Sequence, residues 1–188
     1  MGRVFRATPA ALDTMALGAT SFATTTPTIV LYLPADTVEN GLQMCMIPLE
    51  VRIAQTGTVA GAAVNVVIEA DNANRYTSGG TAATRNNVRP QHGRTSQGLV
   101  RFSVSADAIV ATDAVGTRLA GYTIGQDVSP AEGAVQEVVW TPESGIEPLE
   151  CTASLGSTFL VYTYAGTTGP TVWWSIKWAE FPAVWLGN

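Results

Sequence analysis

Residues 171–181 alternate between apolar and polar side chains with a period of two, which is the pattern of a pleated β-strand. The apolar positions share one face: Val172, Trp174, Ile176 and Trp178. The opposite face carries Thr171, Ser175, Lys177 and Ala179. Two indole rings on the apolar face need a large core. Trp173 interrupts the polar face, and Phe181 and Trp185 follow, so aromatic surface remains after one core is filled. The pattern predicts a β-sheet protein that assembles with other subunits.

The length of 188 residues suits one domain with a single core. Charged residues make up 13% of the chain, against about 25% in average globular proteins, so the surface is polar but weakly charged. The formal net charge of −5 argues against binding to nucleic acid, which requires clustered cations. Lys177 is the only lysine among the 10 cations. This preference for arginine favours paired contacts between subunits, or else reflects the base composition of the genome.

Targeting and redox signals are weak. Cys45 and Cys151 occupy apolar positions of alternating segments, where a free cysteine behaves as a small buried hydrophobe. The sequence has no CxxC motif and no N-x-[ST] sequon, so nothing supports a secreted glycoprotein. Residues 14–35 are uncharged but rich in Thr, Ser, Gly and Pro, which makes them too polar to span a bilayer. We expect a soluble protein with no membrane partner.

Short β-strand patterns recur along most of the chain, separated by Gly and Pro. They cover residues 28–33, 42–55, 62–70, 100–104, 119–124, 134–141, 148–155, 158–165 and 171–181. Pro48 inside the second pattern predicts a sheet edge or a bulge. Residues 56–61 read as a turn, so the patterns 42–55 and 62–70 are predicted to pair as a hairpin. Such a chain with almost no helix predicts an all-β fold, a single antiparallel β-sandwich with jelly-roll connections.

The domain organisation predicted is an extended N-terminal arm over residues 1–26 and a β-sandwich domain over 27–188. The arm has few residues with which to build a core, so it would gain order by packing on a neighbouring molecule. Its predicted anchors are Arg3, Val4, Phe5 and Arg6. The alternative is a frayed terminus without a partner.

Residues 71–98 lack apolar periodicity, and a loop of this length in a compact domain is usually functional or mobile. Four arginines in it are predicted to meet an acidic surface of a partner: Arg75, Arg85, Arg89 and Arg94. A solvated loop is the alternative for these residues. The loop also contains His92, the only histidine.

Catalytic and ligand-binding patterns are largely missing, so we predict a protein that is not an enzyme. A nucleophilic triad would have to use His92, and two distant cysteines with one histidine do not make a usual zinc set. Neither glycine-rich phosphate motif occurs. Residues 71–74 lack the spacing of an EF-hand, although a calcium site of another type on the loops is left open. We assign no catalytic, cofactor-binding or metal-binding residue and expect no cofactor.

Three segments carry a resemblance to a known group of proteins. They are Pro27-Thr28-Ile29-Val30-Leu31-Tyr32-Leu33-Pro34, the turn Thr56-Gly57-Thr58-Val59-Ala60-Gly61, and Trp178-Ala179-Glu180-Phe181-Pro182. From about Thr25 onward the chain resembles small virion proteins of tailed bacteriophages, of the capsid decoration or cement type. The resemblance implies a β-sandwich that forms trimers and acts through its surfaces.

The expected function is therefore a structural virion protein that binds and stabilises a capsid shell by burying surface. Its expected partners are the major capsid protein and further copies of itself, as a trimer. Trp173, Phe181 and Trp185 are predicted subunit contacts, with ordinary core or sheet-covering roles as the alternative. The expected location is the capsid exterior, after assembly in the host cytoplasm. The alternative function is a receptor-binding or glycan-binding module of a head fibre, tail fibre or spike, because exposed aromatic rings stack on sugars.

Overall fold

The computed structural model describes residues 3–9, 15–16, 20–55, 63–89, 93–102, 116–124, 137–142, 149–150, 156–166 and 171–186. These residues form strands β1 (Arg3–Thr8), β2 (Met15–Ala16), β3 (Ile29–Leu33), β4 (Val38–Glu39), β5 (Leu42–Gln55), β6 (Val64–Asp71), β7 (Thr81–Ala82), β8 (Thr84–Asn87), β9 (Leu99–Phe102), β10 (Thr117–Ile124), β11 (Glu137–Trp140), β12 (Leu149–Glu150), β13 (Ser157–Ala165) and β14 (Thr171–Pro182). A 3-10 turn, η2, covers Ala183–Leu186. No helix in these ranges is long and apolar enough to cross a membrane.

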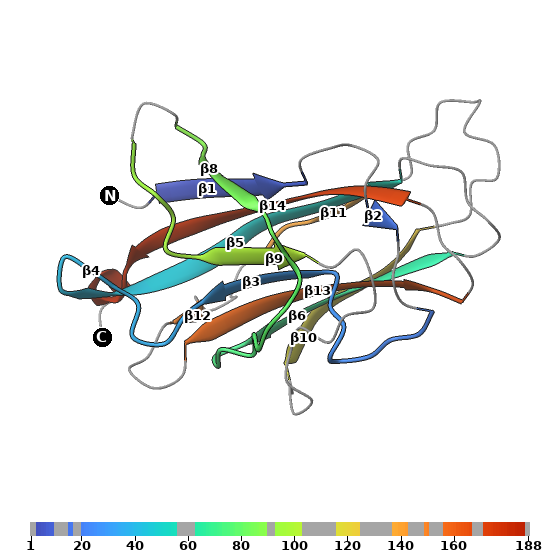
Figure 1. Cartoon of the computed structure of the whole chain (residues 1–188), viewed down its shortest axis with the longest axis horizontal. Helices are drawn as coiled ribbons and strands as arrows, with labels where there is room; N and C mark the ends of the chain where they lie inside the picture. Colours follow the sequence, from blue (N-terminus) through green and yellow to red (C-terminus); the bar gives the residue numbers. More distant parts are fainter. Residues whose placement is uncertain are drawn as a thin grey trace.

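The strands form two antiparallel sheets that pack face to face (Figure 1). Sheet A has the order β11-β5-β14-β1-β8, with β12 and β4 also paired to β5 and β2 paired to β14. Sheet B has the order β10-β6-β13-β3-β9-β7. The predicted all-β antiparallel sandwich is confirmed. The jelly-roll connection order stays a prediction.

The core between the sheets contains the apolar face predicted for the last strand. Trp174, Ile176 and Trp178 are fully buried on β14, and Val172 is 1% exposed. Their partners across the core include Leu31 of β3 and Phe159 of β13, so both sheets contribute to one cluster. Burying such aromatic and branched side chains contributes about 1.5–3 kcal/mol each, which makes this cluster the main source of stability.

The predicted irregularity at Pro48 is confirmed. The pairing of β5 with β14 shifts register between Lys177 and Trp178, and Trp178 stands opposite Pro48. On the other side of β5, β12 pairs with Cys45 and Met46, and β11 pairs with the β5 residues from Val51 to Ala54. Pro48 therefore lies at a register shift of the β5–β14 ladder, a position at which a sheet tolerates proline.

The hairpin predicted between residues 42–55 and 62–70 is wrong. β5 lies in sheet A, where it pairs with β14 along most of its length. β6 lies in sheet B, between β10 and β13. β6 is buried on both faces, as suits a central strand whose outer face is also covered by side chains. β5 buries one face and leaves charged residues on the other. The predicted turn at residues 56–61 lies outside the described residues.

The first strand corrects the prediction of an N-terminal arm. β1 is hydrogen-bonded between β14 and β8, with Phe5 opposite Trp178 on one side and Asn87 on the other. Phe5 is 1% exposed and Ala7 is fully buried. Residues Arg3–Thr8 therefore belong to the sandwich, because the alternation of Phe5 and Ala7 completes the core face of sheet A.

The segment 71–98, predicted as a long loop, contains two short strands. β8 pairs with β1 and forms one edge of sheet A, and β7 pairs with β9 in sheet B. The sequence of β8 is Thr-Arg-Asn-Asn, so it has no apolar alternation to reveal it. Short polar strands of this kind are typical of sheet edges.

Candidate functional site

One end of the sandwich brings together β4, η2, the start of β1 and residues 93–98 (left in Figure 1). β4 and the start of β5 form a hairpin in which Val38 pairs with Gln43 and Glu39 with Leu42. Asn40 and Gly41 have φ values of 52° and 76°, the left-handed geometry of a two-residue hairpin loop. We refer to this region as the β4 end.

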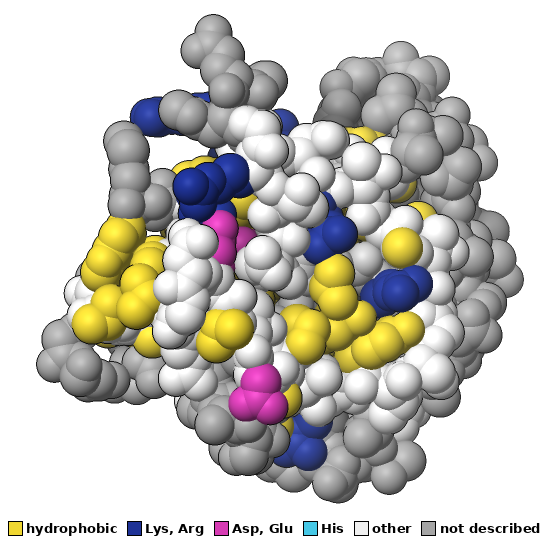
Figure 2. Space-filling model, turned by 60° about the vertical axis from the view of Figure 1, so that its left-hand side comes forward, with side chains coloured by type: hydrophobic (Ala, Val, Ile, Leu, Met, Phe, Trp, Pro, Cys, Tyr) yellow, Lys and Arg dark blue, Asp and Glu magenta, His cyan; other side chains and the backbone are white. Residues whose placement is uncertain are grey.

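Exposed apolar side chains occur on the segments that meet at the β4 end. They are Val38 at 57% exposure, Leu42 at 42%, Val184 at 55% and Trp185 at 53%, and we call them the end patch. The chain brings them together because Pro182, just before η2, pairs with Met44, two residues after Leu42. Figure 2 shows hydrophobic side chains grouped on this side of the molecule, next to a group of basic and acidic side chains.

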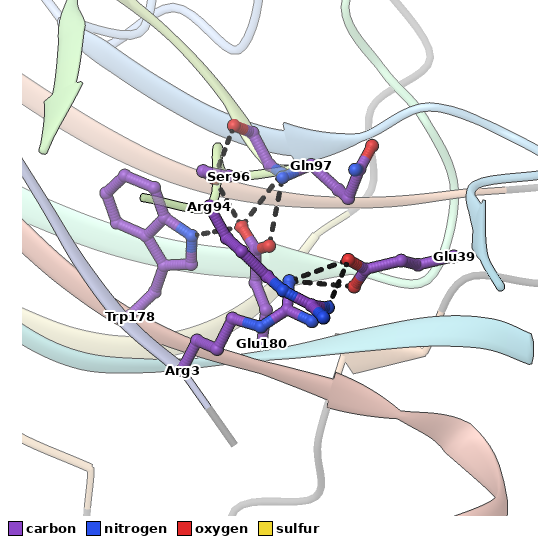
Figure 3. Close-up of polar contacts among 8 residues, drawn as sticks. Arg3, Glu39, Arg94, Ser96, Gln97, Trp178 and Glu180 are labelled. Carbon is purple, nitrogen blue, oxygen red and sulfur yellow. Dashed lines mark hydrogen bonds and ion pairs between the residues drawn. The ribbon is translucent and has the colours of Figure 1, made fainter. Parts of the chain in front are cut away.

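At the β4 end, the carboxylate of Glu39 pairs with two arginines. Arg3 Nη1 lies 2.8 Å from the Glu39 carboxylate, and Arg94 Nη1 lies 3.2 Å from it (Figure 3). The side chains of Arg3 and Glu39 are 20% and 19% exposed, whereas that of Arg94 is 58% exposed. Two guanidinium groups thus share one carboxylate, and Arg94 is the more exposed of the two.

Beneath this group, Glu180 is buried at 1% exposure yet fully supplied with hydrogen bonds. Its carboxylate accepts the backbone N–H groups of Gln97 and Gly98, both at 2.9 Å, and the indole N–H of Trp178 at 2.7 Å. The Ser96 hydroxyl also donates to it (Figure 3). A buried carboxylate is stable in such a setting because each donor replaces a lost water contact. Glu180 therefore fixes the loop before β9 to the last strand of sheet A.

Arg85 holds the same loop from its carbonyl side. Its Nη1 donates to the carbonyls of Ser96 at 3.1 Å and Gly98 at 2.8 Å. A Cβ atom on Gly98 would lie 3.0 Å from Glu180 Oε1 and 3.1 Å from Trp178 Nε1, so only glycine fits here without displacement. The Arg85 guanidinium thus fixes residues 96–98, and its predicted contact with an acidic partner surface stays a prediction. Arg94 emerges two residues before this fixed segment.

The other predicted loop residues lie apart. Arg75 Nε is 2.6 Å from Asp71 Oδ2, on the sheet B side. Arg89 is exposed, and the β1–β8 pairing puts it near Arg3, because the Val88 N–H donates to the Val4 carbonyl. His92 lies outside the described residues. The structure thus brings Arg3, Arg89 and Arg94 to the β4 end and leaves Arg75 elsewhere.

The remaining predicted contacts are divided between two places. Trp185 is in the end patch, and Phe181, half-buried, precedes it. Trp173 lies near the other end of β14, half-buried, with the Arg6 guanidinium 6.0 Å above its ring. Arg6 also donates to Ser175 at 3.2 Å, while Val4 is half-buried.

The prediction of Phe5 as a surface anchor is wrong. Phe5 packs in the core, with its ring centroid 6.0 Å from that of Trp178.

Charged side chains line the outer face of sheet A. Lys177 Nζ lies 3.2 Å from Glu50, and Arg52 lies between Glu50 and Glu137. Burial alone would raise the pKa of Glu50, but the hydrogen bond and charge of Lys177, with Arg52, outweigh it and lower that pKa. The Glu50 carboxylate is therefore stabilised in its charged form by its neighbours.

An aromatic layer covers the outer face of sheet B. Tyr76 stacks on Tyr32 with ring centroids 4.7 Å apart, and Phe22 packs on Tyr162 at 4.9 Å. Arg101 lies over the ring of Tyr76 and Arg118 over that of Phe22. Burial raises the pKa of Tyr162 far above its usual range, and the Glu69 charge raises it further. These rings pack against one another and against arginines, which is the arrangement of a second, smaller core.

Two residues that organise the β4 end were not predicted as functional from the sequence. Glu180 continues the even-numbered alternation of Trp174 and Trp178, so its position on the core face was a usable signal. Glu39 comes directly before Asn40-Gly41, the strongest short-range hairpin signal. Neither signal names the arginines that Glu39 binds, because these come from distant parts of the chain.

The described residues contain no group of three or more His, Cys, Asp or Glu that could hold a metal ion. The arrangement at the β4 end offers apolar area and guanidinium donors, which are suited to binding a protein surface. Comparisons with protein-family models, with curated proteins and with solved structures found no match.

Proposed function

We propose that this chain is a structural virion protein that binds and stabilises a bacteriophage capsid shell through the β4 end. The observation that carries the proposal is the end patch, where Trp185 and three aliphatic side chains are exposed at the same end of the sandwich as Arg94. Scattered apolar residues are normal on a surface, but a group rimmed by charged residues marks an interaction site. The resemblance to capsid decoration proteins supports the choice of a capsid as partner.

The residue types in the patch support a protein partner. Tryptophan and arginine are enriched among the residues that dominate binding energy at interfaces, and they act best when surrounded by contacts that exclude water. Trp185 and Arg94 fit these roles, with Leu42, which pairs with Glu39 across the hairpin, among the surrounding contacts. The proposal includes no catalytic step and no cofactor.

The proposed assembly is a homo-oligomer, a trimer, on the capsid exterior. Trp173 is proposed as a contact between copies, because it lies on the outer face of sheet A, near the end of β14 away from η2. That arrangement leaves the β4 end of each copy for the shell. Sedimentation equilibrium of wild type and Trp173→Ala tests this part separately: a trimer that dissociates in the variant supports it, and a monomeric wild type contradicts it.

Co-sedimentation with DNA-free shells of the parent phage's major capsid protein tests the shell-binding proposal. We expect wild type to bind and Trp185→Ala to lose at least about tenfold in affinity, as for a central interface aromatic. Tyr122→Ala is the matched control, because Tyr122 is an aromatic residue of β10 with 37% exposure. Failure of wild type to bind shells, combined with reproducible binding on a glycan array, would favour the fibre or spike alternative instead.

A further inference from the structure

We infer that the β4 end recognises a protein surface that presents a carboxylate, and that Arg94 is the residue that takes it. This inference rests on the proposed function and names the chemistry of the partner. Three features of the β4 end support it. Glu39 binds both Arg3 and Arg94, the Arg94 side chain is exposed, and hydrogen bonds fix the loop that carries Arg94.

Arg94 has unused capacity for an anion. A guanidinium offers five N–H donors in a planar fork, and the described contact of Arg94 is a single one, from Nη1 to Glu39. Glu39 is held more closely by Arg3, whose Nη1 lies 2.8 Å from the carboxylate and whose side chain is less exposed. A carboxylate of the partner could therefore form a bidentate pair with Arg94, while Arg3 remains bound to Glu39.

Breaking the Arg94–Glu39 ion pair costs little free energy. A new ion pair between Arg94 and the partner's carboxylate contributes more in the complex. An exposed ion pair contributes little to stability because water solvates both ions. The side chain of Arg94 is 58% exposed, so its pair with Glu39 is of this kind. In a complex, a partner seated on the end patch would cover Arg94 and exclude water, which strengthens a hydrogen-bonded ion pair.

The Arg94 side chain extends from a loop whose backbone is held by hydrogen bonds. Gln97 and Gly98 are bound to Glu180 through their N–H groups, and the carbonyls of Ser96 and Gly98 are bound to Arg85. A side chain that starts from a fixed backbone loses less conformational freedom on binding. The partner's carboxylate should therefore meet the patch at Arg94, the more exposed of the two arginines that bind Glu39.

The partner is a protein surface rather than a nucleic acid. The chain has a formal net charge of −5, and the exposed apolar area at this end is suited to apolar side chains rather than phosphates. An acidic residue flanked by apolar side chains on the capsid protein matches both features of the β4 end.

Binding of Arg94 variants to DNA-free shells at low and high salt tests the inference. We expect Arg94→Ala to weaken binding about tenfold at low salt and Arg94→Glu to weaken it further, with the difference from wild type shrinking at high salt. Arg118→Ala is the matched control, since Arg118 has the same 58% side-chain exposure as Arg94 and is ion-paired to Glu69 on sheet B, away from both proposed contacts. Glu39→Gln removes the internal competitor of the partner's carboxylate, so it should bind shells at least as tightly as wild type.

The outcomes separate this inference from the proposed function. If wild type does not bind shells, both fail. If wild type binds and Trp185→Ala does not, but both Arg94 variants bind like wild type, the proposed function stands and the acidic partner is wrong. Weakening by Arg94→Ala that does not change with salt also contradicts the inference, because it would indicate a packing role. A salt-dependent loss with Arg94 variants and retained binding with Glu39→Gln supports it.

Discussion

Trp178 donates its indole N–H to Glu180, two residues further along the same strand, across 2.7 Å. Both side chains lie on the core face of β14, and the same carboxylate binds the loop that carries Arg94. The contact therefore links the largest aromatic cluster of the core to the β4 end. It explains how a carboxylate can be almost wholly buried in an apolar sandwich, and it makes Glu180 a support of the proposed interaction surface.

Replacing Glu180 with glutamine should destabilise the protein. The amide has one oxygen instead of two, so its NH₂ group would face one of the four donors that Glu180 now satisfies. A buried donor left without an acceptor costs about 1–3 kcal/mol, so we expect a loss of about 2 kcal/mol in the free energy of unfolding. Urea denaturation measures it. Glu137→Gln, at an exposed ion pair, should change it little, and equal effects for the two variants would contradict the account.

Gly98→Ala should also be destabilising. The added methyl would lie 3.0 Å from Glu180 Oε1 and 3.1 Å from Trp178 Nε1, so the loop or the carboxylate must move. Overpacking of this kind costs about 1–3 kcal/mol. Gly93→Ala is the matched control in the same segment, because nothing lies within 4 Å of its added methyl. Thermal melts of the two variants compare them directly, and an unchanged Tm for Gly98→Ala would show that the close approach is absent.

Phe5→Ala distinguishes an inner strand from a free arm. Phe5 is 1% exposed and contacts Trp178, so its truncation should cost about 3 kcal/mol in the free energy of unfolding. Val4→Ala changes the neighbouring outward position and should cost about 1 kcal/mol or less. Guanidinium denaturation of both variants checks the difference. If Phe5→Ala were as stable as wild type, residues 3–8 would have to be an arm after all.

The Glu50–Lys177 pair should make stability depend on pH. The folded pKa of Glu50 is lowered, because the effects of Lys177 and Arg52 exceed that of burial. A lowered folded pKa means that its contribution is complete above the unfolded value of about 4.3 and is lost as the pH falls through the folded value. Wild type should therefore be more stable than Glu50→Gln at neutral pH, and the gap should close in acid. Urea denaturation across this range measures the gap, and a constant gap would contradict the linkage.

The sequence predicted those parts of the fold that depend on local pattern. The alternation of Val172, Trp174, Ile176 and Trp178 identified the buried face of β14, and Pro48 identified the bulge, because both signals are carried by a few adjacent residues. It did not predict strand partners. The turn-like residues 56–61 suggested a hairpin, but alternation defines which face is buried and not which strand lies alongside, so β5 and β6 could separate into two sheets.

The candidate site was predictable only in part. Arg94 and Trp185 stood out by residue type, and both lie at the β4 end. Arg85 looked equivalent to Arg94 in the sequence, yet the structure uses it to bind two carbonyls. The difference depends on β8 pairing with β1, a contact between segments far apart in the chain. Phe5 was misassigned for the same reason, since its core contacts are with the other end of the chain.

The most direct test of the central claim is the copy number of this chain in purified virus particles made by the genome that encodes it. Quantitative mass spectrometry against the major capsid protein gives this number. A shell-binding protein should be present at a fixed number of copies per capsid protein, and its copy number should be comparable to that of the capsid protein. Trp185→Ala should lower the number of copies per capsid protein. A few copies per particle, or none, would contradict the account.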